Sequence, residues 1–549
     1  MSNGRIPVHF NGETYQVPEG TSIVEVLGQI YVDEHGVLAA TLNNHLVSLH
    51  TRLDGESYLQ AVTAEHREGQ EILRRTAAHM LQYLCQTHFP GVRLTVGQSL
   101  LGGYFYEVDS SEPVNLEAMA SRLTTLFQEL AEADVSFRHS VVSVEAVPTR
   151  VEDPYGYRKG LLRAWASAVV HLISLDGFTD LQHGPYAPTT RHAKGCRVIA
   201  YPPGLILLFP GSVITSPIPC GVDSRRLYEA YRETRDWNRL VGVTSVGDLN
   251  AASLEDRIPQ VVLMAEALHE KKLAEIADTV TALEQTPRIV CVAGPSSSGK
   301  TTFVKRLAVQ LQVNGLRPIL VSLDDYYLDR QQTPRDEHGD FDFETIEALD
   351  RALIAEQVAA LAAGQPVRLP RFDFVLGQRK NEGLEVQLRP QDVLVLEGIH
   401  ALNPELLPGV NPFRIFVSAL TQLVIDERNR VFTSDARLLR RLVRDRRYRG
   451  TSAAETIERW PKVRAGEERW IFPHQERADA IFNSTLVYET TVLKPFAWRY
   501  LLEVPRSHPS RVRAYELLHF LDLFVPVFPD RIPANSVLRE FIGGSGFEE

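Results

Sequence analysis

The most constraining feature of this sequence is the eight-residue segment GPSSSGKT at 294–301. It fits the pattern GxxxxGK[ST], in which a glycine-rich turn joins a strand to a helix. The context is the required one, because the short apolar run RIVCVA at 288–293 precedes it and the helical sequence TTFVKRLAVQLQVN at 301–314 follows it. A chance match in a strand–helix turn is the alternative, and eight residues in this context weigh against it. The segment therefore predicts a phosphate-binding loop.

The residue types of this loop indicate its chemistry. Glycines let backbone N–H groups converge on phosphate oxygens, and the positive end of the following helix faces the same anion. We expect Lys300 to neutralise the β- and γ-phosphates and the Thr301 hydroxyl to bind Mg²⁺, so the predicted cofactors are ATP and Mg²⁺. The residues expected to hold the nucleotide are Gly294, Pro295, Ser296, Ser297, Ser298, Gly299, Lys300, Thr301 and Thr302.

Strand and helix patterns alternate downstream of the loop. Apolar runs at 318–323, 393–399 and 413–419 are typical of buried strands, and residues 345–364 have the pattern of a helix ending in glycine. Short apolar runs that alternate with helices indicate βαβ units on a parallel sheet.

Two carboxylates follow strands of this expected sheet. Asp324 comes directly after the run at 318–323, and Glu397 stands at the end of the run at 393–399. Ligands of open parallel sheets bind beyond the carboxyl ends of the strands. We therefore expect Asp324 to accept the proton of an attacking hydroxyl as a general base, and Glu397 to hold Mg²⁺ or its water. An aspartate that only caps the next turn is the alternative for Asp324.

An arginine-rich segment lies further along a chain whose net charge is −11. Seven arginines occur in the 13 residues from Arg437 to Arg449, and the first four have helical spacing. Guanidinium groups match phosphate oxygens and stabilise charge on a transferring phosphoryl group. A solvated helix face or an RNA-binding patch is the alternative, but after a phosphate-binding loop a helical lid over ATP is favoured. We expect catalytic roles for Arg437 and Arg444, and nucleotide contacts from Arg440 and Arg449.

Composition limits the class of protein. A length of 549 residues predicts three or four domains, and 44% hydrophobic with 23% charged residues is typical of soluble globular chains. No stretch approaches the roughly 18 apolar residues of a membrane-spanning helix, and no secretory signal is visible. The acidic balance disfavours strong binding to nucleic acid, and four scattered cysteines indicate a reducing compartment. We expect a cytoplasmic protein.

Patterning divides the chain into four parts. Residues 1–63 are β-rich with a hairpin signal at Asn11-Gly12, residues 64–220 are α+β, and residues 221–285 are mostly helical. The helical part lacks the Gly/Ser-rich composition of a flexible linker, so we expect a packed connector. Residues 286–549 form the α/β unit. The expected fold class is multidomain, with β-rich and α+β domains before an α/β P-loop domain with a parallel sheet and a helical lid.

The segment of about 200 residues from 286 to 485 resembles the uridine kinase and phosphoribulokinase family of P-loop kinases. The sequence DDYY at 324–327 is similar to the family's D-S-F-Y segment, which implies that Asp324 is the catalytic base and Tyr327 a substrate-side tyrosine.

Two further segments resemble the family's substrate-binding segments. FDFETIEALD at 341–350 resembles the ribose segment F-D-x-P-x-A-F-D, and counting from its two ends implies either Asp342 or Glu344 as the ribose-binding acid. RFDFVLGQR at 371–379 resembles Y-D-F-V-x-H-S. Here Phe372 stands for the base-recognising tyrosine and Gly377 for the histidine, so the sequence departs from the family where the base is recognised.

The remaining parts carry resemblances of their own. Residues 5–63 resemble a TGS domain, the β-grasp module of threonyl-tRNA synthetase, and residues 64–220 resemble the second additional domain of that synthetase. The ending IPANSVLREFIGGSGF at 532–547 looks like that of bacterial nucleoside kinases with a long N-terminal extension.

The synthetase domain edits with H-x-x-x-H on a helix and a later C-x-x-x-H, a pattern that this chain does not keep. His79 is retained, but Arg75, Gln182 and Tyr186 occupy the other three positions. One histidine cannot build a three-ligand zinc site. The resemblance therefore implies that editing is absent and that His79 is a packed helix histidine.

These features predict ATP-dependent phosphorylation of a nucleoside 5′-hydroxyl, with uridine or cytidine as the first candidates. The alternative within enzymes is a P-loop kinase for another small alcohol or a sugar phosphate, for which Arg379 and Lys380 offer a basic pocket. The alternative of a different class is an RNA-linked nucleotide switch. The expected partner is a nucleoside substrate, with no membrane and no strong nucleic-acid binding, and a homo-oligomer stays open.

Overall fold

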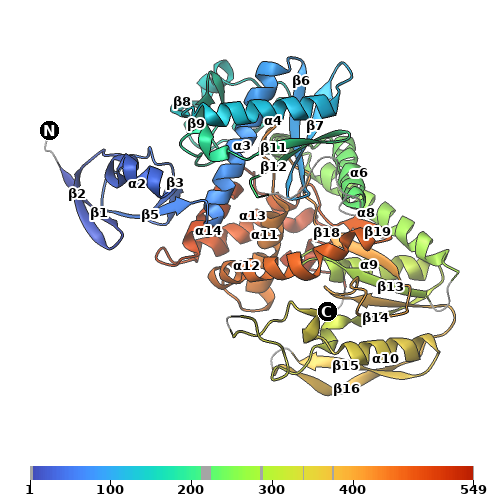
Figure 1. Cartoon of the computed structure of the whole chain (residues 1–549). Coiled ribbons are helices and arrows are strands. Elements are labelled where there is room, and N and C mark those ends of the chain that lie inside the picture. The colour runs from blue at the N-terminus through green and yellow to red at the C-terminus, as the bar shows by residue number, and fades with distance from the viewer. Residues whose placement is uncertain (1–3, 212–223, 285–287, 338, 374–375, 548–549) are drawn as a thin grey trace.

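A computed structural model describes residues 4–211, 224–284, 288–337, 339–373 and 376–547 (Figure 1). The expected boundaries near residues 220 and 285 lie outside the described residues. In these ranges five sheets and the helices packed on them run from a small N-terminal unit at one end of the molecule to the unit that carries the phosphate-binding loop at the other.

The N-terminal unit is one five-stranded sheet with the order β2-β1-β5-β3-β4. Its strands are β1 (Arg5–Phe10), β2 (Glu13–Pro18), β3 (Val37–Leu42), β4 (His45–Val47) and β5 (Ser57–Thr63). The expected hairpin turn is present, with φ of 51° at Asn11 and 81° at Gly12. Two short helices, α1 (Ile23–Leu27) and α2 (Gln29–Glu34), lie between β2 and β3 and are separated at Gly28, which has a φ of 79°.

The next unit packs helices on a four-stranded sheet and adds a three-stranded sheet. The first sheet has the order β11-β12-β7-β6 and the second the order β10-β9-β8. Its elements are α3 (Arg67–His88), β6 (Val92–Leu100), β7 (Gly103–Ser110), α4 (Leu116–Glu132), β8 (Arg138–Ser143), α5 (Tyr157–Leu162), β9 (Val169–Leu175), β10 (Phe178–Leu181), β11 (Arg197–Tyr201) and β12 (Gly204–Leu208). One apolar core joins α3 and α4 to the four-stranded sheet.

Three helices connect this unit to the last one: α6 (Arg225–Val241), α7 (Val246–Leu254) and α8 (Ile258–Thr281). Tyr228 and Tyr231 of α6 share a core with Phe105 of the preceding unit, and Leu273 of α8 shares one with Phe303 of the following unit. The connecting segment is therefore packed against both neighbours.

The α/β unit is built on a sheet of five parallel strands with the order β14-β17-β13-β18-β19. These strands are β13 (Arg288–Ala293), β14 (Arg317–Ser322), β17 (Asp392–Glu397), β18 (Phe413–Ser418) and β19 (Ala480–Asn483). With α9 (Lys300–Val313), α10 (Arg351–Ala362) and the antiparallel pair β15 (Val367–Asp373) and β16 (Gln378–Val386), they confirm the expected multidomain α/β architecture with a parallel sheet.

The helix expected over 345–364 begins later than its sequence pattern suggested. Asp350 accepts a hydrogen bond from the backbone N–H of Leu353 at 3.0 Å and so caps α10. The preceding Ile346–Ala348 forms a separate 3₁₀ turn.

The C-terminal helices are α11 (Thr433–Tyr448), α12 (Ala453–Trp470), α13 (Glu489–Leu502), α14 (Arg511–Asp522) and α15 (Arg539–Ile542). Leu438, Leu439 and Leu442 of α11 are 0% exposed, in a core shared with α12, α13 and α14. The arginine-rich helix therefore differs from the expected lid, because its apolar face packs in the centre of this helical layer (Figure 1). Within the described part of the chain, no helix has the length and apolarity needed to cross a membrane.

Candidate phosphate-binding site

The segment between β13 and α9 adopts a tight turn that its glycines permit. A Cβ placed on Gly294 would lie 2.0 Å from the carbonyl oxygen of Val417, so only glycine fits there. Gly299 has a φ of 82° and directly precedes α9. The turn thus brings successive backbone N–H groups to the start of a helix, where the helix dipole favours an anion.

Two hydroxyls inside this turn are buried without a partner. The Oγ atoms of Ser297 and Ser298 lie in residues that are 3% and 0% exposed, and neither makes a hydrogen bond to any part of the chain that the structure describes. Unsatisfied buried polar groups are costly, and phosphate oxygens would satisfy them. Gly299 also has no side chain with which to cap α9. This cradle fits the phosphates of ATP.

Two carboxylates and a lysine meet beside the cradle. In the register of the sheet Glu397 lies opposite Ser322 of β14 and Val292 of β13, and Asp324 follows Ser322 by two residues. Burial raises the pKa of Glu397 to about 7, Lys300 opposes that shift, and Asp324 adds to it. The edge of three adjacent strands therefore gathers the expected base, cation and metal-binding acid.

Asp324 is exposed to solvent, yet neighbouring protein atoms surround its carboxyl closely enough to desolvate it. Desolvation raises its pKa, while Lys300, Arg449 and Arg444 lower it by their positive charge. Carboxylate and hydroxyl oxygens are the ligands that Mg²⁺ prefers, so Glu397 and Thr301 would suit this ion.

The first two predicted arginines lie behind the loop. Arg437 donates from Nε to the carbonyl oxygen of Ser296 at 3.0 Å and forms an ion pair with Glu467. Its side chain is 1% exposed. Arg440 pairs with Glu489 at 2.6 Å, and its side chain is 0% exposed. Both charges are neutralised within the protein, so these residues hold the loop in place and do not form an open lid face.

The other predicted arginines lie nearer Asp324. Arg444 and Arg449 contact Asp445 at 3.3 and 3.5 Å, and both lower the pKa of Asp324. Arg441, which sequence reasoning did not assign to the site, donates from Nη1 to the Oγ of Ser296 at 2.9 Å.

The residues expected on the substrate side form a second group. The Tyr327 hydroxyl donates to the carbonyl oxygen of Phe343 at 3.0 Å, and the rings of Tyr327 and Phe372 lie 6.1 Å apart. Burial raises the pKa of Glu344 to about 7, with Arg441 opposing. Asp342 accepts a hydrogen bond from the backbone N–H of Glu344 at 3.0 Å, so one of its oxygens is used in a local turn.

The expected basic pocket is internally neutralised. Arg379 pairs with Asp350 at 2.9 Å, and Lys380 lies 3.4 Å from Asp373. Gly377 has a φ of 68°, and a Cβ there would lie 2.9 Å from Nε of Arg330. A histidine cannot take the place of this glycine without strain.

Comparison with known proteins agrees with this geometry. The model of the phosphoribulokinase/uridine kinase family matches residues 289–491. A uridine kinase of Halalkalibacterium halodurans is 33% identical over 196 residues, which are 36% of this chain and 85% of that protein. The chain belongs to the phosphoribulokinase/uridine kinase family.

Further relatives match the same part of the chain. A uridine kinase of Anoxybacillus flavithermus is 30% identical over 36% of this chain and 87% of its own length. A solved structure described as "Structure of a Possible Uridine Kinase from Bacillus stearothermophilus" is 20% identical, with a TM-score of 0.28, and covers 39% of this chain and 98% of that one. The family model and the two relatives named uridine kinase are the matches that show the family, and they lie in the α/β unit.

Besides Arg441, three residues of this kinase-family site were not anticipated. Glu467 of α12 accepts a hydrogen bond from the backbone N–H of Ser296 at 2.9 Å, and Glu540 accepts one from the Thr302 hydroxyl at 2.9 Å. Ser484 donates from Oγ to the carbonyl oxygen of Ser298. Ser484 follows β19 at the same sheet edge, so the rule on strand ends could have found it, whereas no sequence pattern marks the two glutamates.

The surroundings of His79 and Tyr186, two of the positions compared with an editing site in the sequence, are filled by protein. His79 is 0% exposed, as expected for a packed helix histidine, and its Nδ1 accepts a hydrogen bond from Arg428. Arg428 also contacts the Tyr186 hydroxyl at 3.3 Å and Asp180 at 2.7 Å. Among the described residues no group of three or more His, Cys, Asp or Glu could hold a metal ion. The segment that leads from β18 into α11 thus occupies this place.

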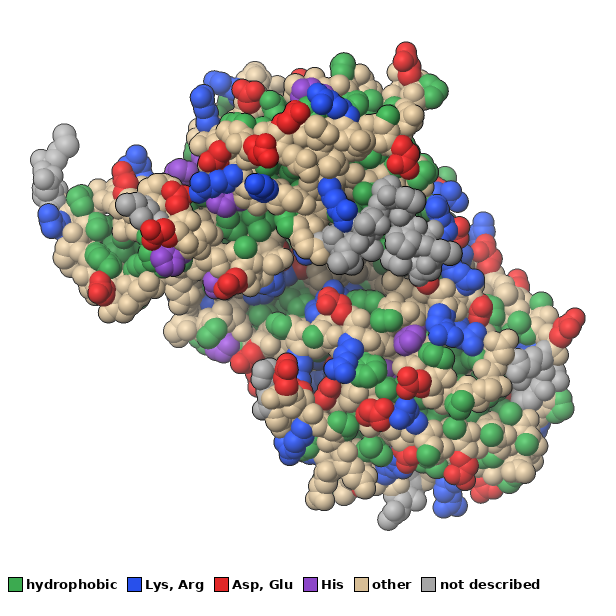
Figure 2. All heavy atoms as spheres, viewed as in Figure 1, with side chains coloured by type: hydrophobic (Ala, Val, Ile, Leu, Met, Phe, Trp, Pro, Cys, Tyr) green, Lys and Arg blue, Asp and Glu red, His purple; other side chains and the backbone are tan. Residues whose placement is uncertain are grey.

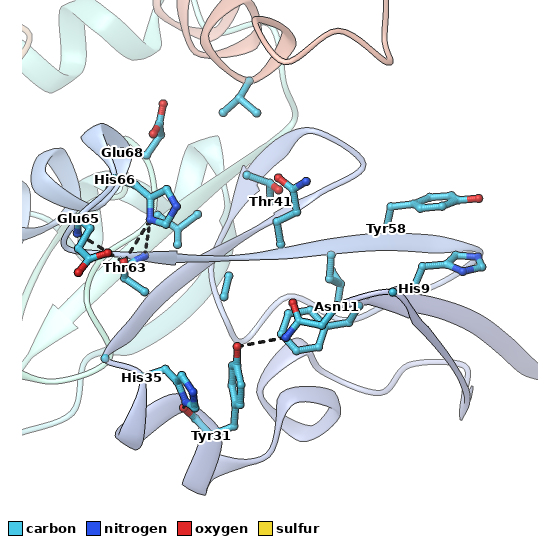
Figure 3. A pocket seen from close by; sticks show the side chains of 18 of the residues that line it. His9, Asn11, Tyr31, His35, Thr41, Tyr58, Thr63, Glu65, His66 and Glu68 are labelled. Atoms are coloured by element: carbon cyan, nitrogen blue, oxygen red, sulfur yellow. Dashed lines mark hydrogen bonds between the residues drawn. The ribbon is translucent and has the colours of Figure 1, made fainter. Parts of the chain in front are cut away.

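An open groove of about 1270 Å³ lies far from the loop, on the N-terminal sheet (Figure 3). His9, Tyr31, Tyr58 and His66 are among the side chains around it, and it reaches Pro509 before α14. Neither predicted chemistry nor the family match falls on this groove, so the phosphate-binding loop remains the candidate site.

Proposed function

We propose that this protein transfers the γ-phosphate of ATP to the 5′-hydroxyl of a nucleoside, with uridine or cytidine as the first candidates. This proposal rests on the convergence of Lys300, Asp324 and Glu397 beside the phosphate cradle, at the edge of adjacent parallel strands. The curated relatives named uridine kinase, which match this part of the chain, support the choice of acceptor.

Each group at this edge has a task that follows from its position. Backbone amides of 294–301 and the Lys300 ammonium bind the phosphates, and Thr301 with Glu397 would hold Mg²⁺, which neutralises phosphate charge when bound. Asp324 orients the acceptor hydroxyl and takes its proton. Desolvation raises the pKa of this carboxyl, which suits a general base, and the charges of Lys300 and two arginines oppose that shift.

Arg444 and Arg449 supply positive charge where charge develops in the transition state. Arg437 and Arg440 act on the loop and do not contact the nucleotide, because they donate hydrogen bonds to the carbonyl oxygens of Ser296 and Ser297. They fix the loop in the shape that offers its N–H groups to the nucleotide, and we assign them as positioning residues.

For the acceptor we propose that Glu344 binds the ribose hydroxyls and that Tyr327 and Phe372 flank the nucleoside. Glu344 is favoured over Asp342, whose oxygen is used in the local turn. Because Phe372 and Gly377 replace hydrogen-bonding side chains of the family pattern, we expect weak discrimination between pyrimidine bases.

The alternatives receive less support. The charges of Arg379 and Lys380 are paired with Asp350 and Asp373, so they offer little to a phosphorylated sugar. A nucleic-acid-binding surface usually carries a continuous basic patch. On the face of the molecule in Figure 2, acidic and basic side chains are instead interspersed, which does not favour an RNA-linked function.

For the N-terminal part we propose a TGS-like domain at 1–63, a domain at 64–220 that resembles the synthetase editing domain with a degenerate site, and a connector at 221–285 before the kinase domain at 286–549. The sheets support this division, since strands β1–β5 form one sheet and strands β6–β12 form two others.

Labelled ATP incubated with a panel of nucleosides, sugar phosphates and small alcohols tests the function. Lys300→Ala and Asp324→Asn should each lower turnover at least about 100-fold, as loss of a positioning cation or a base does. Lys271→Ala on the exposed face of α8 and Asp530→Asn near the C-terminus are the matched controls and should leave it unchanged. Phosphorylation of no acceptor in the panel would refute the proposal.

A further inference from the structure

A carboxylate from the C-terminal segment lies on the phosphate-binding loop. The Thr302 hydroxyl donates to Oε2 of Glu540 at 2.9 Å, and the backbone N–H of Thr302 donates to the same oxygen at 3.3 Å. Glu540 belongs to the four-residue helix α15, 238 residues further along the chain. An anion from a remote segment thus occupies donors in the first turn of α9.

These donors are of the kind that a P-loop offers to a nucleotide. The N–H groups in the first turn of a helix point out of its N-terminus, which is the positive end of the helix dipole. Together with the glycine-rich loop they bind phosphate oxygens. A carboxylate and a phosphate both accept charge-assisted hydrogen bonds from such groups. Glu540 and a nucleotide phosphate therefore require the same place beside Thr302.

The backbone that carries Glu540 is firmly packed. Val537, Leu538 and Phe541 are 0% exposed, and the Phe541 ring lies 5.2 Å from the guanidinium of Arg440. A Cβ placed on Gly299 would lie 2.6 Å from Val537 Cγ1, so the segment abuts the loop itself. Glu540 is only half-buried. Its side chain can turn toward solvent while the segment stays in place.

The charge of Glu540 also reaches the metal-binding side of the site. Glu540 is one of the groups that raise the pKa of Glu397, after burial and Asp324. A triphosphate that enters this space meets like charge from Glu540 for as long as the carboxylate stays on Thr302.

Building on the proposed function, we propose that Glu540 sets the affinity of the site for nucleotides: its carboxylate competes with a nucleotide phosphate for the Thr302 donors and turns away when the nucleotide binds. The competition concerns phosphate oxygens alone. A nucleoside without phosphates therefore binds independently of Glu540.

Isothermal titration calorimetry of the full chain at fixed salt tests this, with MgATP, MgADP and adenosine as probes. The proteins are the wild type, Glu540→Gln, which keeps the size of the side chain, Glu540→Ala, and Asp530→Asn as a control that changes an exposed carboxylate of the same segment. We expect Glu540→Ala to bind ATP and ADP about tenfold more tightly, Glu540→Gln to change in the same direction, and adenosine binding and the control to stay unchanged.

Unchanged or weaker binding of ATP and ADP in Glu540→Gln would overturn the inference and make Glu540 a helix cap for α9 or a support for Thr302. Equal tightening for adenosine would overturn it as well, because the effect would not concern phosphate. These results leave the proposed function standing if the wild type phosphorylates a nucleoside. Absence of ATP binding in every form would overturn both.

Discussion

The buried pair of Arg440 and Glu489 allows a quantitative test of how the phosphate-binding loop is held. Arg440 is 0% and Glu489 2% exposed, and besides the pair Arg440 donates to the Ser484 hydroxyl at 3.1 Å and to its carbonyl oxygen at 2.9 Å. Arg440→Met removes all of these donors and leaves a buried carboxylate unpaired. Breaking one side of a buried pair costs about 3–5 kcal/mol.

The double variant Arg440→Met/Glu489→Gln removes both charges. Replacing a whole buried pair by neutral groups is often close to neutral in stability, so we expect it to recover most of the loss. Arg446→Met on the same helix is the control. Its partner Glu503 and Arg446 itself are 37% and 40% exposed, and such surface pairs contribute roughly 0–1 kcal/mol.

Hydrogen exchange of backbone amides in α11 and α13 measures this locally, which avoids assuming two-state unfolding of a chain with several domains. A loss of 3–5 kcal/mol corresponds to an increase of about 100-fold to 4000-fold in the opening equilibrium. Nucleotide binding should stay weak in both Arg440 variants, because the donor to the Ser297 carbonyl oxygen is gone. Exchange in Arg440→Met equal to that of Arg446→Met would refute the assignment of Arg440 as a positioning residue.

Three further outcomes are expected. A fragment that begins near residue 280 should be far less soluble than the full chain, because three charged residues of the α/β unit would lose their partners. These pairs are Arg428 with Asp180, Glu427 with Arg158, and Asp426 with His183. A soluble, fully active fragment would contradict this. Glu344→Gln should flatten the pH dependence of stability: burial raises the pKa of Glu344 from 4.5 to about 7, so the native state keeps a proton that the unfolded chain loses, and stability falls as pH rises through this window. The urea concentration at the midpoint of unfolding is measured at pH 5 and pH 8 for the wild type and for Glu344→Gln. The same change of midpoint with pH in both proteins would count against a desolvated carboxyl. Gly377→His should lower the melting temperature without sharpening the choice between uridine and other nucleosides, because φ is 68° at this position and the added Cβ would meet Arg330.

The parallel sheet and the loop could be predicted because their signals are local. The runs that became β13, β14, β17 and β18 are short, apolar and separated by helical patterns, and the glycine spacing of the loop requires a strand before it and a helix after it. The positions of Asp324 and Glu397 could be predicted because ligands bind beyond the carboxyl ends of parallel strands. Both residues stand at such ends, on the neighbouring strands β14 and β17.

The role of the arginine-rich helix could not be predicted from spacing. Its arginines share helical periodicity, but so do Leu438, Leu439 and Leu442, and burial of those leucines placed the helix in the core. The partners Glu467 and Glu489 are distant in sequence and lie in ordinary helical patterns. Contacts between remote segments, such as that of Glu540 with Thr302, produce no periodic pattern in the sequence and could not be predicted from it.

Transfer of a phosphoryl group from ATP to a nucleoside hydroxyl, at the edge formed by Lys300, Asp324 and Glu397, must yield ADP and a phosphorylated nucleoside together. The most direct measurement follows ADP and the phosphorylated product together, by phosphorus NMR, for the full chain with MgATP in the presence and absence of uridine or cytidine. We expect ADP and nucleoside 5′-monophosphate in equal amounts, both dependent on the nucleoside and both lost in Asp324→Asn. Formation of ADP without any phosphorylated acceptor, or equal product from Asp324→Asn, would contradict it.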